Sequence, residues 1–384
     1  MKYVKLTLSY LLVALLATMI TMAVCGGEEE REYHKLDELE SLIDTYFIGQ
    51  ADQAAMEDAA ASAMVDALED KWSYYMTAQD YITYQEQMNN AYVGIGITIS
   101  LTEDEAGFEI IKVNSGGPAE EAGLLAGDVI VAIEGQSTAG MSTTDARNLV
   151  RGEEGTKVTL TVRRGDKTLE QEVERRTVQT PVAQAQLLDG NIGLVTIANF
   201  DERCSQETIS AIEQLLGQGA EALIFDVRNN PGGYKHELVK LLDYLLPEGP
   251  LFRSEEYSGK VSVDESDAAC LDIPMAVMVN GNSYSAAEFF AAALAEYDAA
   301  IVVGQQTTGK GYFQSTFKLS DGSAVVLSIG KYTTPKGVNL ADVGITPSVC
   351  VEVDEETAYR IYAGILDPAE DPQIQAAVEA LLEK

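Results

Sequence analysis

The hydrophobic pattern changes its period along the chain. Between about residues 35 and 91, apolar residues recur three and four positions apart, which is typical of amphipathic helices. The first helix would carry its apolar face on Leu36, Leu39, Leu42 and Ile43. From residue 93 onward apolar and polar residues alternate, as expected for strands with one buried face.

A small β-rich module is predicted in the region that follows residue 93. Gly117-Pro118-Ala119 opens a short helix that closes at Gly123, and a second helix covers residues 141–150. The predicted strands are residues 108–113, 128–133, 157–163 and 169–174. We expect the module to end near Thr177, because Pro181 marks the exit from the pattern.

Beyond this module, strands and helices alternate. The predicted strands are residues 192–197, 222–227, 275–279 and 301–303, and the predicted helices are residues 205–216, 235–246 and 285–297. Residues 313–319 and 324–329 form a predicted hairpin. Asp371 and Pro372 are typical of the N-cap and first position of a last helix, residues 372–382. Such alternation predicts an α/β core with a mostly parallel sheet.

The N-terminal segment is predicted to be a membrane anchor. A charge-free run, residues 6–25, follows Lys2 and Lys5 and precedes an acidic stretch. A helix of that length spans a bilayer core of about 30 Å. The charges on either side place the N-terminus inside the cell and the rest outside. We therefore expect a single-pass protein of the cell membrane with its folded part on the extracytoplasmic side, or a secreted protein if a weak site at Thr21 and Ala23 is cleaved.

Composition excludes several classes of protein. The chain has 61 acidic and 26 basic residues and a formal net charge of −35. Nucleic-acid binding needs a basic surface, so no nucleic-acid partner is expected. There are only two histidines, and the four cysteines form no CxxC pair. The sequence therefore indicates neither a metal site nor a disulfide framework, and no cofactor is expected.

Ser285 is the first candidate for chemistry. A predicted buried strand ends at Val279 and an alanine-rich helix follows, with Ser285 at or near its first turn. There the hydroxyl would be close to unpaired backbone amides, which can stabilise an oxyanion. A serine at this position is more often only an N-cap, so the position alone does not assign a nucleophile.

Lys310 is the second candidate, between Gly309 and Gly311 after a buried strand. An exposed lysine in a turn would give the same sequence pattern and remains an alternative. A phosphate-binding loop is discounted, because the GxxxxGK[ST] spacing of such loops is missing. No histidine is well placed for a triad, so a serine nucleophile would need a lysine whose pKa burial has lowered from about 10.4. Gln314 is placed to hold the amine by a hydrogen bond.

An oxyanion hole is predicted from a glycine pair. Gly232-Gly233 follows the predicted strand at residues 222–227 and supplies amides that no side chain obstructs. These amides would act beside the amide of Ala286.

Together these stretches resemble the carboxyl-terminal processing peptidases, serine proteases with a Ser–Lys pair and an embedded PDZ domain. Ser285 and Lys310 are 25 positions apart (310 − 285), which is the family's spacing. The resemblance extends from the helices near Ala60 to the last helix. The matching stretches are residues 223–233, 282–288, 309–311 with Gln314, 93–96, 117–119, 122–124 and 127–130.

The resemblance implies an α/β core of Clp-protease/crotonase-like type, with an inserted β-rich PDZ domain and flanking helical segments. It implies that Ser285 is the nucleophile, Lys310 the general base and Gln314 its orienter. It also implies that the oxyanion amides belong to Ala286 and to Gly232 or Gly233.

The resemblance gives the PDZ domain a role as well. Its loop, Val93, Gly94, Ile95 and Gly96, would bind the terminal carboxylate of a substrate through backbone amides. Arg151 is a candidate for relaying occupancy of this domain to the core, and a plain surface arginine is the alternative.

The expected function is that of an exported, membrane-anchored serine endopeptidase that cleaves proteins near their C-termini. A homodimer is also expected, because residues 35–68 and the last helix carry apolar faces without an obvious partner in the same domain. The alternatives are an inactive PDZ-containing membrane-tethered scaffold and a crotonase-like acyl-CoA enzyme. The expected limits are 1–27 for the anchor or signal segment, 28–90 for a helical region, 91–178 for the PDZ domain, 179–365 for the peptidase core and 366–384 for the C-terminal helix.

Overall fold

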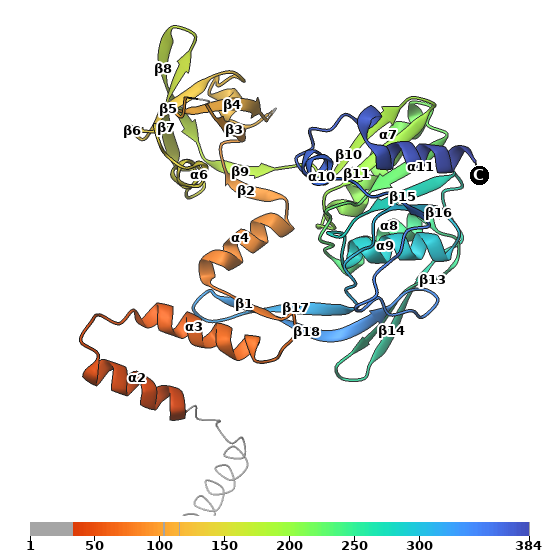
Figure 1. The fold of residues 1–384 in the computed structure, drawn as a ribbon, viewed down its shortest axis with the longest axis horizontal. Coiled ribbons are helices and arrows are strands. Elements are labelled where there is room, and N and C mark those ends of the chain that lie inside the picture. Colours follow the sequence, from red (N-terminus) through yellow and green to blue (C-terminus); the bar gives the residue numbers. More distant parts are fainter. Residues whose placement is uncertain (1–33, 103, 115, 384) are drawn as a thin grey trace, which may run out of the picture. The chain divides into compact units, whose positions relative to one another are not determined.

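The computed structural model describes residues 34–102, 104–114 and 116–383 (Figure 1). The chain divides into two compact units, of which the first ends at Ala63 and the second begins at Met64. The first unit contains α2 (His34–Tyr46) and most of α3 (Gln53–Asp66). The anchor predicted at residues 1–27 lies outside the described part of the chain. Within that part, no helix combines the length and the apolar character that crossing a membrane requires.

A six-stranded sheet forms the centre of the second unit. Its strand order is β10-β11-β12-β15-β16-β19, and every neighbouring pair is parallel except β10 with β11. The strands are β10 (Ala183–Leu188), β11 (Ile192–Ile197), β12 (Ala222–Asp226), β15 (Met275–Val279), β16 (Ala300–Gly304) and β19 (Val349–Cys350). The predicted α/β core with a mostly parallel sheet is therefore confirmed.

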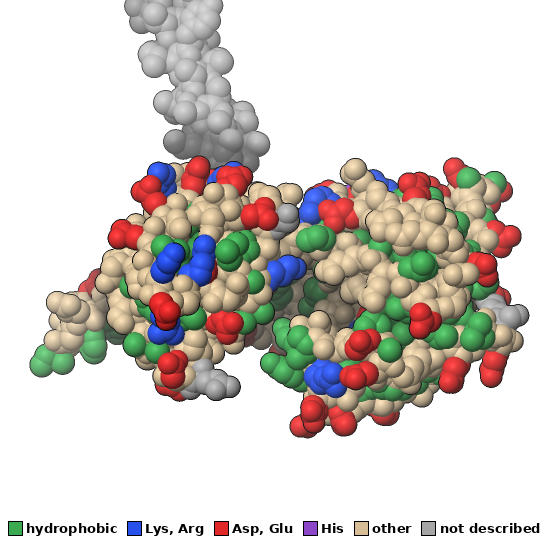
Figure 2. All heavy atoms as spheres, turned by 90° about the horizontal axis from the view of Figure 1, so that it is seen from above, with side chains coloured by type: hydrophobic (Ala, Val, Ile, Leu, Met, Phe, Trp, Pro, Cys, Tyr) green, Lys and Arg blue, Asp and Glu red, His purple; other side chains and the backbone are tan. Residues whose placement is uncertain are grey.

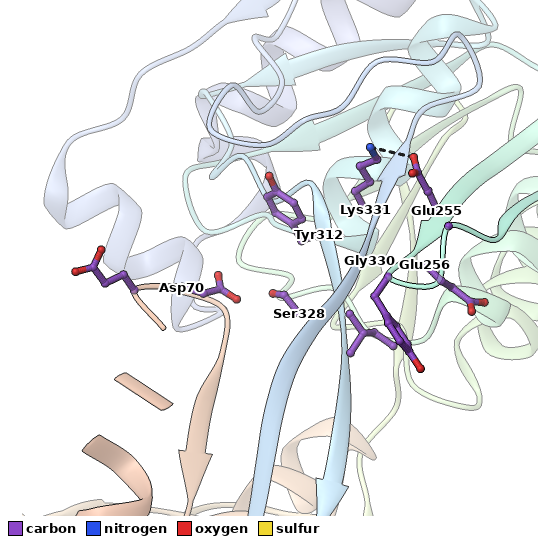
Figure 3. Close-up of a pocket in the computed structure, with 11 residues that line it drawn as sticks. Asp70, Glu255, Glu256, Tyr312, Ser328, Gly330 and Lys331 are labelled. Atoms are coloured by element: carbon purple, nitrogen blue, oxygen red, sulfur yellow. Dashed lines mark ion pairs between the residues drawn. The ribbon is translucent and has the colours of Figure 1, made fainter. Parts of the chain in front are cut away.

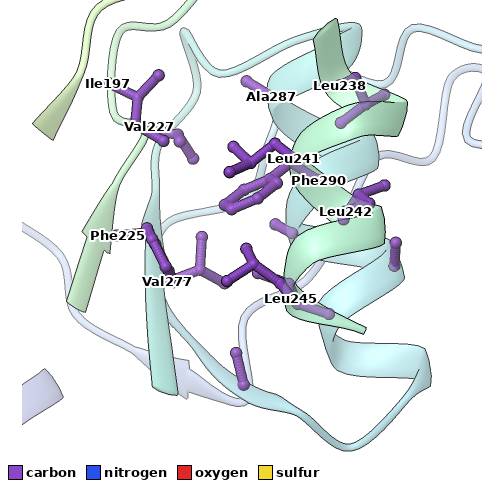
Figure 4. Packing of buried hydrophobic residues seen from close by; sticks show 14 of the residues in the cluster. Ile197, Phe225, Val227, Leu238, Leu241, Leu242, Leu245, Val277, Ala287 and Phe290 are labelled. Carbon is purple, nitrogen blue, oxygen red and sulfur yellow. The ribbon is translucent and has the colours of Figure 1, made fainter. Parts of the chain in front are cut away.

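Both faces of this sheet are covered, as apolar runs without polar alternation require. On β12, Leu223 and Phe225 belong to the larger core, whereas Ala222 and Ile224 belong to the core on the opposite face. Figure 4 shows α8 and α9 packed over the larger core. The helices that contribute to it are α7 (Cys204–Gly217), α8 (Lys235–Leu245) and α9 (Ala286–Glu296).

The last helix, α11 (Pro372–Leu382), covers the other face. Its Ile374, Ala377 and Leu381 are buried against the sheet, so the prediction that this apolar face lacks a partner within its domain is wrong. Asp371 caps the helix as predicted and also pairs, at 2.8 Å, with the buried guanidinium of Arg228. The helix is therefore part of the core rather than a free surface.

A second, antiparallel sheet was only partly foreseen. The hairpin of β17 (Tyr312–Lys318) and β18 (Ala324–Thr333) confirms the predicted one. The sheet also contains β13 (Gly249–Glu256), β14 (Val261–Ser266) and β1 (Tyr74–Met76). Strand β1 lies within the region predicted to be helical, and it forms because it pairs with β18 in register Tyr74 to Val326. Helix α4 (Ala78–Met88) follows it, capped by the Thr77 hydroxyl.

The predicted β-rich module is present. Its sheet has the order β3-β4-β5-β7-β8, with β6 paired to β5, and its core includes Phe108, Ile130 and Leu160. A two-stranded ribbon, β2 with β9, connects it to the rest of the chain. The strands are β2 (Ala91–Gly94), β3 (Ile97–Leu101), β4 (Phe108–Val113), β5 (Val129–Ile133), β6 (Gln136–Ser137), β7 (Lys157–Arg164), β8 (Lys167–Glu174) and β9 (Arg176–Gln179). The helices of the module are α5 (Pro118–Glu121) and α6 (Thr143–Val150).

The surface reflects the excess of acidic residues. Figure 2 shows acidic side chains spread widely over one face, with fewer basic ones between them.

The helical elements between β19 and α11 are α10 (Glu355–Tyr362) and η1 (Pro368–Glu370).

Candidate active site

Ser285 lies at the sharp turn between β15 and α9. Its backbone angles are φ 59° and ψ −121°, whereas an ordinary N-cap residue is extended. Such a conformation costs a residue other than glycine about 1–3 kcal/mol and persists only where the surroundings enforce it. Because an N-cap alone would not need this strain, the geometry favours a functional serine over a simple cap.

The loop after β12 packs directly against this turn. A Cβ atom on Gly232, where φ is +87°, would lie 2.7 Å from Ser285 Cβ and 2.8 Å from the Ala286 amide nitrogen. The Gly232 amide donates to Asn230 Oδ1 at 2.8 Å. Among the hydrogen bonds of the described residues, none is donated by the Gly233 or Ala286 amide. Of the two predicted glycines, Gly233 therefore has the amide available for an oxyanion.

We expect Gly232→Ala to inactivate the site while leaving the fold largely intact. The added methyl group would collide with Ser285 and Ala286, so the loop would have to move away from the nucleophile. A displacement of about 1 Å at a catalytic centre costs about a hundredfold in rate. Peptide hydrolysis and thermal unfolding should be measured together, with Gly259→Ala as the control, because no atom lies within 4 Å of a Cβ there. Equal rates for the two variants would contradict this role of the loop.

Lys310 lies partly buried in the loop before β17. Its Nζ is 4.7 Å from the centre of the Trp72 ring and 5.8 Å from that of Tyr284. Burial lowers the pKa of Lys310 to about 8, and the charges of Glu288 and Asp70 oppose this decrease. A lysine with this pKa is neutral in an appreciable fraction of molecules near neutral pH, so it can accept a proton.

Glu288 connects the serine turn to the lysine loop, and sequence reasoning missed it. Its carboxylate is fully buried and accepts hydrogen bonds from the amides of Ser285 (3.1 Å), Gly309 (2.6 Å) and Lys310 (2.9 Å), and from the Thr307 hydroxyl (2.5 Å). The signal in the sequence was the S-x-x-E spacing from Ser285 to Glu288, which is that of a capping box.

One groove of about 620 Å³ contains the predicted catalytic residues. Ser285, Lys310, Gln314 and Gly233 all line it. Aromatic side chains form much of the remaining wall: Trp72, Tyr74, Tyr81, Tyr84, Tyr234, Phe252, Tyr284 and Phe313. Such a mixture of apolar wall and a few convergent polar groups is typical of a ligand site.

Gln314 does not bind the lysine amine in this structure. Its amide nitrogen donates to the Tyr312 carbonyl and to the Ser328 hydroxyl, both at 3.1 Å. No hydrogen bond from the described residues joins it to Lys310, so its orienting role stays a prediction. Instead, the Tyr332 hydroxyl donates to the Lys310 carbonyl and fixes the backbone of the loop.

The predicted carboxylate-binding loop lies at the entry to the β-rich module. Val93 and Gly94 are paired with β9, whereas Ile95 is buried in the module's core and Gly96 has a φ of +77°. The carbonyls of Ile95 and Gly96 accept hydrogen bonds from Ala119 and Asn114. Its binding function is not tested by these contacts and stays a prediction.

Arg151 is not a free surface arginine. It follows α6 and forms an ion pair with Glu86 of α4 at 2.7 Å, and its guanidinium lies 5.3 Å from the centre of the Tyr92 ring. The side chain thus connects the β-rich module to the helix that follows β1. A role in relaying occupancy stays a prediction.

Comparison with known proteins agrees with these features. Residues 191–351 match the model of peptidase family S41, and residues 109–164 match a PDZ domain. The carboxyl-terminal-processing protease of Synechocystis sp. is 32% identical over 84% of this chain and 76% of that protein. The carboxy-terminal processing protease CtpA of Bacillus subtilis is 29% identical over 92% of this chain and 78% of that protein.

A solved structure of an S41 protease from Bacteroides fragilis shares the fold, with a TM-score of 0.56 at 16% identity over 84% of this chain and 90% of that one. The predicted fold class, a Clp-like S41 core with a PDZ domain, is confirmed. The match to the Synechocystis protease, together with the S41 and PDZ matches, establishes the family. The chain belongs to the carboxyl-terminal processing proteases, serine proteases of peptidase family S41.

Proposed function

We propose that this protein is a serine endopeptidase in which Ser285 and Lys310 form the catalytic pair. The observation that carries the proposal is the partly buried Lys310, which shares one groove with the strained Ser285 and whose backbone amide binds the same Glu288 carboxylate as the Ser285 amide. Neither metal nor nucleotide is needed for this chemistry.

In the proposed reaction, Ser285 Oγ attacks the peptide carbonyl carbon while neutral Lys310 Nζ takes the hydroxyl proton. The negative charge that develops on the carbonyl oxygen is stabilised by the amides of Ala286 and Gly233. The lysine ammonium then gives the proton to the leaving amine, and the peptide C–N bond breaks. A water molecule, deprotonated by the same lysine, hydrolyses the acyl-enzyme and restores Ser285.

The proposed substrates are proteins that are cut near their C-termini. The names of the Synechocystis and Bacillus subtilis relatives state carboxyl-terminal processing, and the PDZ match fits a protease that binds protein ends. The test compares C-terminal peptides by mass spectrometry in cells that express the wild-type protein or Ser285→Ala. New shortened C-termini should depend on Ser285, and identical sets of C-termini would refute the proposal.

The PDZ domain is proposed to hold the substrate's terminal carboxylate at residues 93–96. Hydrogen bonds from backbone amides to a charged acceptor are about twice as strong as those to a neutral one. Amidating the C-terminus of an apolar peptide should therefore weaken its binding to the inactive Ser285→Ala protein about tenfold or more. Fluorescence anisotropy of the acid and amide forms provides the measurement, and equal affinities would remove carboxylate capture.

Export, membrane anchoring and dimerisation are further parts of the proposal. The charge-free run at residues 6–25 supports an anchor with the protease outside the cell. Cell fractionation with external protease treatment tests both the membrane anchoring and the export.

The proposed dimer is supported by exposed apolar residues on α2, among them Leu39 and Leu42, because the apolar face of α11 is used in the core. Light scattering should then give twice the monomer mass, and a monomeric mass would exclude the dimer.

A further inference from the structure

Three loops form the candidate site, and Glu288 joins only two of them, the serine turn and the lysine loop. The Thr308 hydroxyl of the lysine loop also donates to the Gly281 carbonyl at 2.7 Å. The third loop, residues 228–233, carries the glycine pair, and we call it the glycine loop. Among the described residues, it makes no hydrogen bond to Glu288. Other contacts must therefore fix its position relative to the nucleophile.

The glycine loop and the serine turn leave the sheet side by side. Strands β12 and β15 are parallel neighbours, so their carboxyl ends lie at the same edge of the sheet. Their ladder ends where the Val227 amide donates to the Met278 carbonyl at 3.1 Å. Beyond this point, side chains continue the pairing of the two segments.

Three asparagines join the two loops there, and we call them the asparagine clasp: Asn229, Asn280 and Asn282. The backbone amide of Asn229 donates to Asn280 Oδ1 at 2.9 Å, and Asn280 Nδ2 donates to Asn229 Oδ1 at 3.0 Å. Asn282 Nδ2 donates to the same oxygen of Asn229, also at 3.0 Å. Three hydrogen bonds thus connect the loops, and two of them end on the Asn229 side chain.

Asn229 also directs the path of the glycine loop. Its φ is 57°, a left-handed conformation that asparagine and glycine adopt more readily than other residues. The next residue, Asn230, is fully buried. Asn230 Oδ1 accepts from the Gly232 amide and its Nδ2 donates to the Ile197 carbonyl, both at 2.8 Å. Asn229 therefore lies at the base of the short segment that carries the Gly233 amide.

We propose that the asparagine clasp positions the oxyanion hole: it holds the Gly233 amide of one loop at a fixed distance from the Ala286 amide of the other. The clasp residues do not touch the reacting atoms and act through these two amides. Both amides must lie about 2.7–3.1 Å from the developing oxyanion at the same time, so a mobile glycine loop loses transition-state binding. The kinetic part of this inference rests on the proposed function, whereas the anchoring of the loops does not.

The lysine side of the site is held separately. Strand β17, which follows the Lys310 loop, pairs with β18 in register Tyr312 to Lys331. Figure 3 shows these two residues at a neighbouring cavity of about 580 Å³, where Lys331 forms an ion pair with Glu255 at 2.9 Å. None of the three hydrogen bonds of the clasp is made to this part of the chain. A loosened clasp should therefore lower kcat while the pKa of Lys310 stays at about 8.

Asn229→Gly tests the clasp most directly. Glycine keeps the left-handed backbone but lacks the oxygen that accepts two of the hydrogen bonds. We expect kcat to fall about ten- to a hundredfold, with KM changed less than about twofold. Asn229→Asp keeps an oxygen for the same two donors and should retain most of the wild-type rate. Asn282→Ala removes one hydrogen bond of an exposed side chain and should give a smaller decrease.

The variants should remain folded, because two contacts between the loops do not involve the clasp side chains. The Ser283 hydroxyl donates to the Val227 carbonyl at 2.7 Å, and the Tyr284 amide donates to the Asn230 carbonyl at 3.2 Å.

Asn191→Gly is the matched control. Asn191 is also left-handed, with a φ of 58°, and precedes β11 at the opposite edge of the sheet. The same substitution there should leave kcat unchanged.

The experiment measures catalysis and loop anchoring separately in the full-length protein. Initial rates with a fluorogenic peptide give kcat, KM and the pH profile. Hydrogen–deuterium exchange, followed by mass spectrometry of peptides that cover residues 228–234 and 280–286, reports on the loops without turnover. We expect faster exchange in both segments for Asn229→Gly, and wild-type exchange for Asn229→Asp and Asn191→Gly.

Wild-type kcat or wild-type exchange in Asn229→Gly would overturn the proposal, and so would an equal loss of rate in Asn191→Gly. A shifted midpoint of the pH profile in Asn229→Gly would place the effect on Lys310 and would also overturn it. If the wild-type protein cleaves no peptide through Ser285, the proposed function fails, and the exchange measurement alone then decides whether the clasp anchors the loops.

Discussion

Replacing Lys310 by alanine should abolish peptide hydrolysis, and Ser285→Ala should do the same. General-base catalysis contributes about 10²–10⁴-fold, and without Ser285 no acyl-enzyme can form. The double variant should be no slower than either single one, because the two groups act as a unit. In the wild-type protein, the rate should rise with pH through the pKa of Lys310 near 8, since only the neutral amine accepts a proton. Initial rates with a fluorogenic peptide measure all three variants.

Lys318→Ala is the control for this prediction. Lys318 is an exposed lysine on β17, the strand that follows the Lys310 loop, so its loss should leave both the rate and the pH profile unchanged. Appreciable turnover by Lys310→Ala would exclude the mechanism. So would a wild-type rate that falls as the pH rises through 8.

The second large effect is expected from Glu288→Gln. Four donors converge on this buried carboxylate, and an amide in its place would turn its own N–H groups toward some of them. Leaving buried donors without acceptors costs about 1–3 kcal/mol each. We therefore expect a loss of about 2–5 kcal/mol in the free energy of unfolding and a decrease of about a hundredfold in kcat.

Urea denaturation and steady-state kinetics test this prediction together. Glu213→Gln on α7 is the control, because Glu213 is exposed and the same change of charge should cost little there. A stable, fully active Glu288→Gln protein would show that the carboxylate does not hold the two catalytic loops. A stable but slow protein would confine its role to the orientation of Ser285 and Lys310.

The parallel core could be predicted because its signals are local. Each buried strand is a short apolar run, and the hairpin at β17 and β18 is joined by a turn sequence between alternating residues. Strand β1 could not be found in this way, because its three residues become a strand only by pairing with β18. Strand β13 was missed for a related reason. It is a strand because it pairs with β14 and β18, and such pairing is not visible in its own sequence.

In the candidate site, too, the residues with local sequence signals could be predicted and those that depend on distant contacts could not. Ser285, Lys310 and the glycine pair stand next to strand ends, where backbone groups are free, so their types and positions pointed to chemistry. Glu288 gave only a capping signal, and its function depends on a loop more than twenty positions away.

The pairing of β1 with β18 also determines when the site can exist during synthesis. Ser73 and Ser328 are 255 positions apart, so Trp72 can take its place beside Lys310 only after β18 has been made and has paired with β1. A growing chain that already contains Ser285 and Lys310 but not yet β18 therefore lacks the Trp72 ring beside the lysine. Such long-range contacts form late because their loop must close first. The topology therefore predicts that the surroundings of Lys310 are completed late in folding, after β1 has paired with β18.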